Sequence, residues 1–271
     1  MAATLSTGDD VLSPETSAFY RRAIQALAAA EVPFLVGGAY ALAHYTGIVR
    51  HTKDFDFFVL PQDARRILDL LAGLGYRTEL TFPHWLGKAY HGDDFCDIIF
   101  SSGNGFCVVD ESWLEYAEPA EILGESVRLV PAVEMIWSKG YVIERERYDG
   151  ADICHILRSY GDRLDWRRLL ARFGPHWRVL LSHLVLFGFV YPGESAKVPA
   201  WVMEELMDRL GAEVQTPPPD EHLCQGTLLS RAQYLKDIET WGYHDARLGP
   251  EGTMSSKDVR RWTAPVKNGQ L

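Results

Sequence analysis

The chain has 271 residues, of which 47% are hydrophobic and 24% are charged, as in an ordinary globular protein. This composition excludes a disordered or fibrous protein, and the length allows one large domain or two smaller ones. The 27 basic and 37 acidic side chains give a net charge of −10, and the excess lies in residues 1–164, with 14 basic and 24 acidic groups. A protein that coats nucleic acid needs a basic face, so this class is excluded, although a local patch or a metal-assisted site is not.

The cysteines and the N-terminal segment indicate the compartment. The first ten residues have neither a basic start nor an apolar core, so we do not expect a signal peptide. The most apolar run, residues 179–191, is shorter than the roughly 20 residues that span a bilayer, and we expect a buried helix there. The four cysteines form no Cys-x-x-Cys pair and have no zinc spacing. We therefore expect reduced thiols and a cytoplasmic protein that does not associate with a membrane.

A capped helix is predicted near the N-terminus, after a flexible tail of residues 1–12. Ser13, Pro14 and Glu15 supply a capping hydroxyl, a proline at the first helical position and an acid near the positive helix end. Apolar residues then recur at helical spacing, and Pro33 ends the helix.

Short strands and helices are predicted in alternation up to residue 130. Runs of β-branched and aromatic residues indicate the strands, and apolar residues at three- or four-residue spacing indicate the helices. The predicted elements are a strand at 34–36, a helix at 39–45, a strand at 52–60, a helix at 64–72, and strands at 88–91, 95–100 and 127–130. The clearest of them is the strand at 52–60, which Pro61 closes.

From residue 132 onward the pattern is helical. Helices are predicted at 132–144, 150–160, 165–172, 176–190, 199–210 and 231–241, and the tail after Ala264 is expected to be loose. The sequence therefore predicts an α+β fold, a small mixed sheet flanked by helices, with a helical C-terminal region. We place one domain, which contains the predicted sheet, at residues 13–163 and a helical domain at residues 164–271.

Two acids share one face of the clearest strand. Asp54 and Asp56 alternate with Phe55 and Phe57, so the carboxylates lie on one face and the rings on the opposite, apolar face. Neighbouring carboxylates repel each other, and both stay ionised only if a cation lies between them. Oxygen ligands of this kind suit Mg²⁺, which binds through one or two carboxylates and substrate phosphates.

A third acid is found in a later strand. Asp97 lies within an apolar run, where a lone charge is costly unless it is paired or binds a metal. Beside Asp54 and Asp56 it would complete a two-metal site for phosphoryl transfer, or it would polarise an attacking hydroxyl as a general base. The alternative for Asp97 is a salt bridge with a nearby lysine or arginine.

Gly37 and Gly38 lie between the predicted strand at 34–36 and the short helix after it. Glycines let the backbone approach a ligand closely, and a helix N-terminus offers N–H groups and a partial positive charge to a phosphate. Alone, a Gly-Gly pair or an Asp-x-Asp pair is weak evidence for a binding site. The two pairs together, about 16 residues apart in a strand–helix–strand order, are more specific evidence.

This combination resembles the nucleotidyltransferase superfamily with the polymerase-β-like catalytic fold, and it is most similar to minimal and abortive-infection-type bacterial nucleotidyltransferases. Those proteins pair a GG or GS turn with an Arg-x-Thr/Ser-Lys-Asp-x-Asp strand, which residues 50–56 match. The family's lysine on a later helix corresponds to Lys139. Its acidic helix start corresponds to Asp149 and Asp152, although Tyr148 stands where the family often has lysine. The resemblance covers about residues 33–160.

The resemblance implies the nucleotidyltransferase fold and an Mg²⁺-dependent enzyme that transfers a nucleoside monophosphate from an NTP to an acceptor. Asp54, Asp56 and Asp97 would hold two Mg²⁺ ions, with Asp97 as the third ligand or the base. The implied contacts to the nucleotide are made by Gly37, Gly38, Arg50, Thr52, Lys53, Lys139 and Asp149.

Several alternatives stay open. The acceptor is a small molecule, a protein or an RNA 3′ end such as that of tRNA; the acidic charge disfavours RNA, whereas the resemblance to toxins favours it. The alternative to an enzyme is a nucleotide-binding or toxin–antitoxin module of the same fold, with an antitoxin as its partner. The alternative for Lys139 is an ordinary lysine on a helix surface. The alternative for Asp149 and Asp152 is helix capping or a favourable interaction with the helix dipole. The choice of NTP and the oligomeric state are not determined.

Overall fold

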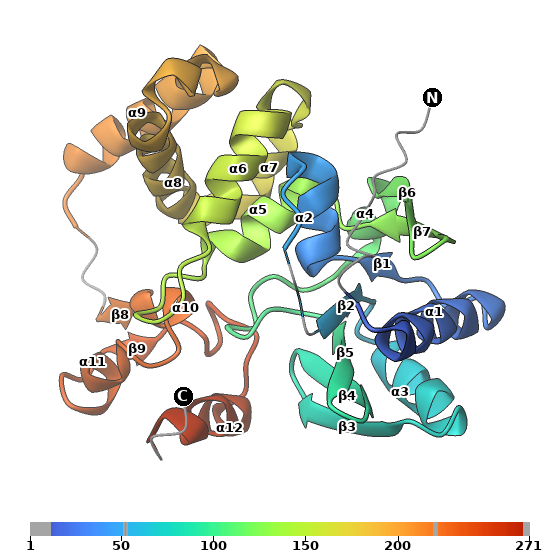
Figure 1. Ribbon diagram of the computed structural model, residues 1–271. Helices are drawn as coiled ribbons and strands as arrows, with labels where there is room; N and C mark the ends of the chain where they lie inside the picture. The colour runs from blue at the N-terminus through green and yellow to red at the C-terminus, as the bar shows by residue number, and fades with distance from the viewer. Residues whose placement is uncertain (1–11, 51, 53, 219–221, 268–271) are drawn as a thin grey trace. The chain divides into compact units, whose positions relative to one another are not determined.

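The computed structural model describes residues 12–50, 52, 54–218 and 222–267, with side chains up to residue 264 (Figure 1). The chain forms two compact units. Unit 1 comprises residues 1–131 and 252–271, and unit 2 comprises residues 132–251. The last 20 residues of the chain therefore belong to the same unit as the first part. The predicted domain boundary at residue 163 lies within unit 2, and the division into two domains stays a prediction. Apart from residue 12, the flexible tail predicted at residues 1–12 lies outside the described residues.

Unit 1 begins with the predicted order of helix, strand and helix. The Ser13 side chain caps α1 (Pro14–Ala29), as expected. β1 (Leu35–Val36) leads into α2 (Gly38–Thr46), which ends at Gly47. Gly47 has a φ of +73°, the left-handed conformation that favours glycine at a helix end.

A mixed sheet forms the centre of unit 1. Within the described residues it has seven strands in the order β3-β4-β5-β2-β1-β7-β6. β2 pairs in parallel with β5, β1 pairs in parallel with β7, and the other neighbours are antiparallel. The strands after β1 are β2 (Asp54–Phe58), β3 (Arg77–Phe82), β4 (Leu86–His91), β5 (Asp94–Ile99), β6 (Glu118–Ile122) and β7 (Glu125–Leu129). The predicted α+β class is confirmed.

The two faces of β2 differ in polarity, as the alternation predicts. Phe55 and Phe57 are fully buried, and the Phe55 ring lies 5.1 Å from the ring of Tyr20 in α1. α1 and α3 (Ala64–Gly73) cover this apolar face of the sheet (Figure 1). The aspartates of β2 therefore lie on the opposite face of the sheet.

Two edge strands and a short helix are present that the sequence pattern does not predict. β3 and β6 lie at the two edges of the sheet, and α4 (Glu111–Glu115) precedes β6. Arg77 and Glu79 of β3 are exposed, as are Pro119 and Glu121 of β6, and an edge strand tolerates such a proline. Neither strand has a continuous run of β-branched and aromatic residues, so the sequence pattern does not indicate them.

A helix of unit 1 continues into residues 265–267, which corrects the expected loose tail for these residues, and residues 268–271 lie outside the described residues. α12 (Ser256–Lys267) extends three residues beyond Ala264. The Trp262 ring lies 5.0 Å from the ring of Phe82 and 5.5 Å from that of Trp85. A helix as polar as α12 is stabilised mainly by such tertiary contacts, which a helical pattern in the sequence does not reveal.

We expect Trp262→Ala to lower the free energy of unfolding of unit 1 by about 2–3 kcal/mol, somewhat less than for a fully buried tryptophan. The substitution removes a ring that contacts Phe82, His84 and Trp85. Urea unfolding followed by circular dichroism measures this change. Trp241→Ala is the matched control, since Trp241 is 57% exposed and its loss should cost no more than about 0.5 kcal/mol. Equal losses in both variants would contradict a stabilising role for α12.

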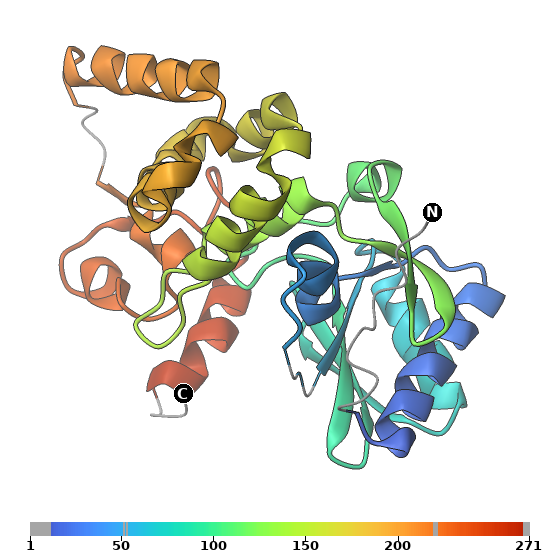
Figure 2. The ribbon, with the colours of Figure 1, turned by 45° about the horizontal axis from the view of Figure 1, so that its top comes forward.

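Unit 2 is mostly helical (Figure 2). Five helices match predicted ones within a few residues: α5 (Ala132–Gly140), α6 (Gly150–Tyr160), α7 (Trp166–Phe173), α8 (Trp177–Val190) and α9 (Ala200–Val214). The short elements that follow are β8 (Leu223–Cys224), α10 (Gly226–Leu229), α11 (Leu235–Glu239) and β9 (His244–Asp245). Glu134 of α5 is fully buried and accepts hydrogen bonds from Arg168 and Arg172 of α7, which fixes these two helices to each other.

The helix predicted at residues 231–241 is wrong for most of its length, because only α11 forms there. The Ser230 hydroxyl and the Arg231 N–H donate hydrogen bonds of 2.7 and 2.8 Å to the carboxylate of Glu144, which is distant in the sequence. This tertiary contact fixes the backbone at the start of the segment, and the sequence pattern does not report it. Gly242, with a φ of +78°, follows the short helix.

The apolar run at residues 179–191 lies almost entirely within α8, where a helix was predicted. Leu180, Leu184 and Phe187 are buried, whereas Phe189 is 82% exposed, so only one face of the helix is covered. In the described part of the chain, no helix combines the length and the hydrophobicity needed to cross a membrane.

Candidate metal and nucleotide site

Three carboxylates meet on the face of the sheet opposite α1 and α3. In the parallel pairing of β2 with β5, Asp56 is the register partner of Asp97, and Asp54 lies two residues before Asp56. One carboxylate oxygen of each residue lies within 4.8 Å of those of the other two. The structure thus brings together the three acids that the sequence analysis selects, and we call them the acid triad.

The electrostatics of the acid triad favour a positively charged partner. Burial raises the pKa of the Asp97 carboxyl above its ordinary value, and the negative charge of Asp54 adds to this shift. The Lys88 ammonium, 2.5 Å from Asp97 Oδ1, opposes it. Burial, together with the charges of the nearby aspartates, also raises the pKa of the neighbouring Cys96 thiol. The negative charges of the aspartates thus add to the effect of burial, and a cation bound among them would oppose both shifts.

Gly37 and Gly38 lie directly against β2. The Gly37 N–H donates a 3.0 Å hydrogen bond to the main-chain oxygen of Asp56. A Cβ at Gly38 would stand 1.8 Å from Asp56 Oδ2, and one at Gly37 would stand 2.3 Å from the Phe58 ring. Only glycine therefore allows α2 to begin beside the acid triad. The first N–H groups of a helix have no acceptor within it, so this end of α2 suits an anion.

The residues that precede β2 are placed only in part. The Thr52 hydroxyl hydrogen-bonds the carboxylate of Asp54, which orients this acid. Arg50 is exposed before the strand, and Lys53 lies outside the described residues. The structure therefore places Thr52 at the acid triad, while the predicted phosphate contacts of Arg50, Thr52 and Lys53 stay predictions.

A second charged cluster lies within unit 2. Lys139 Nζ is 2.9 Å from Asp149 Oδ2 and 2.9 Å from Asp152 Oδ2, and Arg147 Nε is 3.1 Å from Asp149 Oδ1. Burial acts to raise the pKa of Asp149, but the hydrogen bonds and charges of Arg147 and Lys139 outweigh it and lower this pKa.

The charged cluster argues against two alternatives, a surface lysine at Lys139 and a side-chain cap at Asp149. The Lys139 side chain is only 18% exposed, unlike an ordinary surface lysine, and the Asp149 side chain does not cap α6. The cluster holds the Lys139 ammonium in a fixed place within unit 2. The nucleotide-binding roles of Lys139 and Asp149 stay predictions.

Lys88 is a candidate that the sequence analysis misses. It is the register partner of Asp97 in the pairing of β4 with β5, and its ammonium contacts both Asp97 and the Phe95 ring, 3.9 Å from the ring centre. The salt bridge considered as the alternative for Asp97 is therefore present, next to the other two acids. The pairing of Lys88 with Asp97 could have been predicted from the two-residue Gly92-Asp93 turn, because a hairpin closed at that point places residue 88 opposite residue 97.

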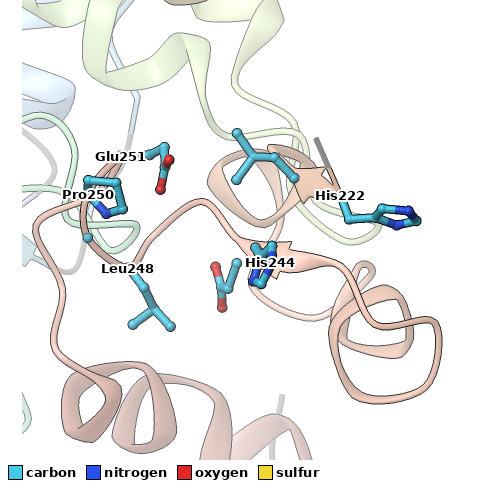
Figure 3. A pocket seen from close by; sticks show the side chains of 8 residues that line it. His222, His244, Leu248, Pro250 and Glu251 are labelled. Atoms are coloured by element: carbon cyan, nitrogen blue, oxygen red, sulfur yellow. The ribbon is translucent and has the colours of Figure 1, made fainter. Parts of the chain in front are cut away.

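A pocket of about 440 Å³ lies in unit 2, and none of the residues selected by sequence lines it. Figure 3 shows His222, Leu248 and Glu251 on different sides of it. Asp245 also lines the pocket, but Arg247 already binds its carboxylate, with 2.6 Å between Arg247 Nη2 and Asp245 Oδ2. Among the described residues, only the acid triad groups three or more possible metal-ligating side chains closely enough to hold one ion.

The chain resembles several solved nucleotidyltransferase structures at low identity. The antibiotic-resistance factor ANT(2″)-Ia is 16% identical, with 75% of this chain and 97% of that chain covered and a TM-score of 0.41. The lincosamide antibiotic adenylyltransferase LnuA, in its lincomycin-bound structure, is 16% identical, with 54% and 96% covered and a TM-score of 0.39. A putative nucleotidyltransferase from Thermotoga maritima is 16% identical, with 44% and 80% covered and a TM-score of 0.36.

No family model matches the chain, and no curated protein matches it either. TM-scores and identities this low do not establish a function. The function is therefore argued from the residues of the acid triad and their surroundings.

Proposed function

We propose that this protein is a divalent-metal-dependent nucleotidyltransferase that transfers a nucleoside monophosphate from an NTP to an acceptor. The observation that carries this proposal is the acid triad, whose carboxylate oxygens converge within 4.8 Å beside the glycines that begin α2. An oxygen-only set of ligands suits Mg²⁺, which typically binds through carboxylates together with substrate phosphates.

The residues around the triad fit a metal-bound triphosphate. Thr52 orients Asp54, and the close approach of Gly38 leaves the N-terminus of α2 beside Asp56. The partial positive charge and N–H groups of that helix end favour a phosphate. When bound, divalent ions would neutralise triphosphate charge and polarise the attacking oxygen.

The proposed step is an in-line displacement at the α-phosphorus. The oxygen of an acceptor hydroxyl forms a bond to this phosphorus, and the bond from the phosphorus to the oxygen that bridges to the β-phosphate breaks. Pyrophosphate leaves, and the hydroxyl proton passes to the Asp97 carboxylate. Asp97 is placed for this role by its register with Asp56 in the acid triad.

The test uses the wild-type protein, Mg²⁺ and each of the four NTPs, labelled at either the α- or the γ-phosphate. Small metabolites, proteins and RNA from a cell extract serve as separate acceptor pools. We expect α-label to enter one pool, with release of pyrophosphate, and we expect EDTA to abolish both.

Two outcomes would contradict the proposal. Transfer of the γ-label instead would indicate a kinase. Binding of an NTP without transfer to any pool would favour the nucleotide-binding module. The pool that takes up the α-label identifies the class of acceptor.

A further inference from the structure

Lys88 lies between two carboxylates of neighbouring strands. Its register partner on β5 is Asp97, and its register partner on β3 is Glu79. The ammonium is 2.5 Å from Asp97 Oδ1 and also interacts electrostatically with Glu79. The lysine side chain is 19% exposed, so the ammonium is largely shielded from water.

Two contacts hold Lys88 on the Asp97 side. One is the ion pair with Asp97, and the other is a cation–π contact with Phe95, 3.9 Å from the ring centre. Asp54, one of the other two acids, lies opposite Phe95 in the pairing of β2 with β5. A positive charge thus already stands at the acid triad.

An ammonium and a divalent cation at Asp97 repel each other, so each weakens the binding of the other. The carboxylate can bind either cation through its oxygens. Glu79 offers the lysine a second partner, because Glu79 lies on the opposite side of Lys88 from Asp97 in the sheet order β3-β4-β5.

We propose that Lys88 is the internal counter-ion of the acid triad in the metal-free protein, and that a divalent cation displaces its ammonium from Asp97 toward Glu79. This inference rests on the proposed function, since it assumes that the triad binds metal. Lys88 is then a positioning residue that sets the metal affinity: it keeps the three acids together without metal and weakens metal binding.

The test measures Mn²⁺ binding to the full chain by electron paramagnetic resonance of the free ion. We expect Lys88→Met to tighten Mn²⁺ binding by about ten-fold, because a unit charge close to a divalent ion is removed. Lys88→Arg keeps the charge and should stay close to wild type. Glu79→Gln should weaken binding, because the displaced ammonium loses its second partner.

Thermal unfolding with and without Mn²⁺ supplies a second readout. Without metal, Lys88→Met should unfold at a lower temperature than wild type, because three acids are left without a counter-ion, and Mn²⁺ should raise its unfolding temperature more than that of wild type. A Lys88→Met variant that folds only when Mn²⁺ is present would support the inference in the same way.

The outcomes separate this inference from the proposed function. If wild type binds Mn²⁺ but Lys88→Met binds it no more tightly, Lys88 is a structural ion-pair partner and the inference is wrong. If Glu79→Gln binds Mn²⁺ like wild type, displacement toward Glu79 is wrong. If neither wild type nor Lys88→Met binds Mn²⁺, the metal site itself, and the proposed function with it, is wrong.

Discussion

Asp56→Asn is expected to lower the rate of nucleotidyl transfer by at least about a thousand-fold, because the loss of one metal ligand removes several kcal/mol of transition-state stabilisation. Asp56 lies at the centre of the site: it is the register partner of Asp97, and its carboxylate lies against Gly38. Asparagine has nearly the same shape but carries no charge. Pyrophosphate release from the NTP identified with wild type, at saturating Mg²⁺, measures the effect.

Two controls make this result specific to the acid triad. Asp93→Asn removes an exposed carboxylate from the turn between β4 and β5, close in sequence to Asp97, and should leave the rate within about two-fold of wild type. The unfolding temperature of Asp56→Asn should not fall by more than a few degrees, since one of three repelling charges is removed. An Asp56→Asn variant that keeps most of the activity would contradict metal binding by the triad.

The sequence predicts the central part of unit 1 because each element there carries its own local signal. Ser13 and Pro14 mark the start of α1, Gly47 marks the end of α2, and the alternation around Phe55 assigns the two faces of β2. The convergence of the acids is a different matter. It depends on the parallel pairing of β2 with β5, which the sequence analysis assumes and does not derive.

The elements that the sequence analysis misses owe their structure to tertiary contacts. β3 and β6 are edge strands with exposed polar residues, and α12 is stabilised by the contact of Trp262 with a distant aromatic cluster. The start of the segment predicted as a helix at 231–241 is likewise held by a tertiary contact, in which the Glu144 carboxylate accepts hydrogen bonds from the Ser230 hydroxyl and the Arg231 N–H. Hydrophobic periodicity reports none of these contacts.

The pairing of Lys88 with Asp97 could have been predicted from the sequence. The strand around Lys88 and the strand around Asp97 are both predicted, and Gly92 with Asp93 between them is a common two-residue hairpin turn. Counting outward from that turn places Lys88 opposite Asp97. The alternative of a salt bridge with a nearby lysine or arginine would then have named Lys88 as the partner of Asp97.

Gly38→Ala is expected to lower the transfer rate by about a hundred-fold or more, although it changes no charged or ligating group, because displacements near 1 Å can have effects of this size. The new Cβ would stand 1.8 Å from Asp56 Oδ2, so the carboxylate must move away from its place in the triad. Mn²⁺ affinity should fall together with the rate. Gly38 also has a φ of +54°, so alanine adds a backbone strain of about 1–2 kcal/mol.

Gly47→Ala separates strain from displacement. Gly47 ends the same helix with a φ of +73°, and a Cβ there meets no atom within 4 Å. Both alanine variants should therefore lose a similar amount of stability to strain in urea unfolding, while only Gly38→Ala should lose Mn²⁺ affinity and transfer activity. Equal losses of activity in the two variants would mean that α2 acts through its stability alone. A selective loss in Gly38→Ala would show that the close approach of α2 to Asp56 is part of the site.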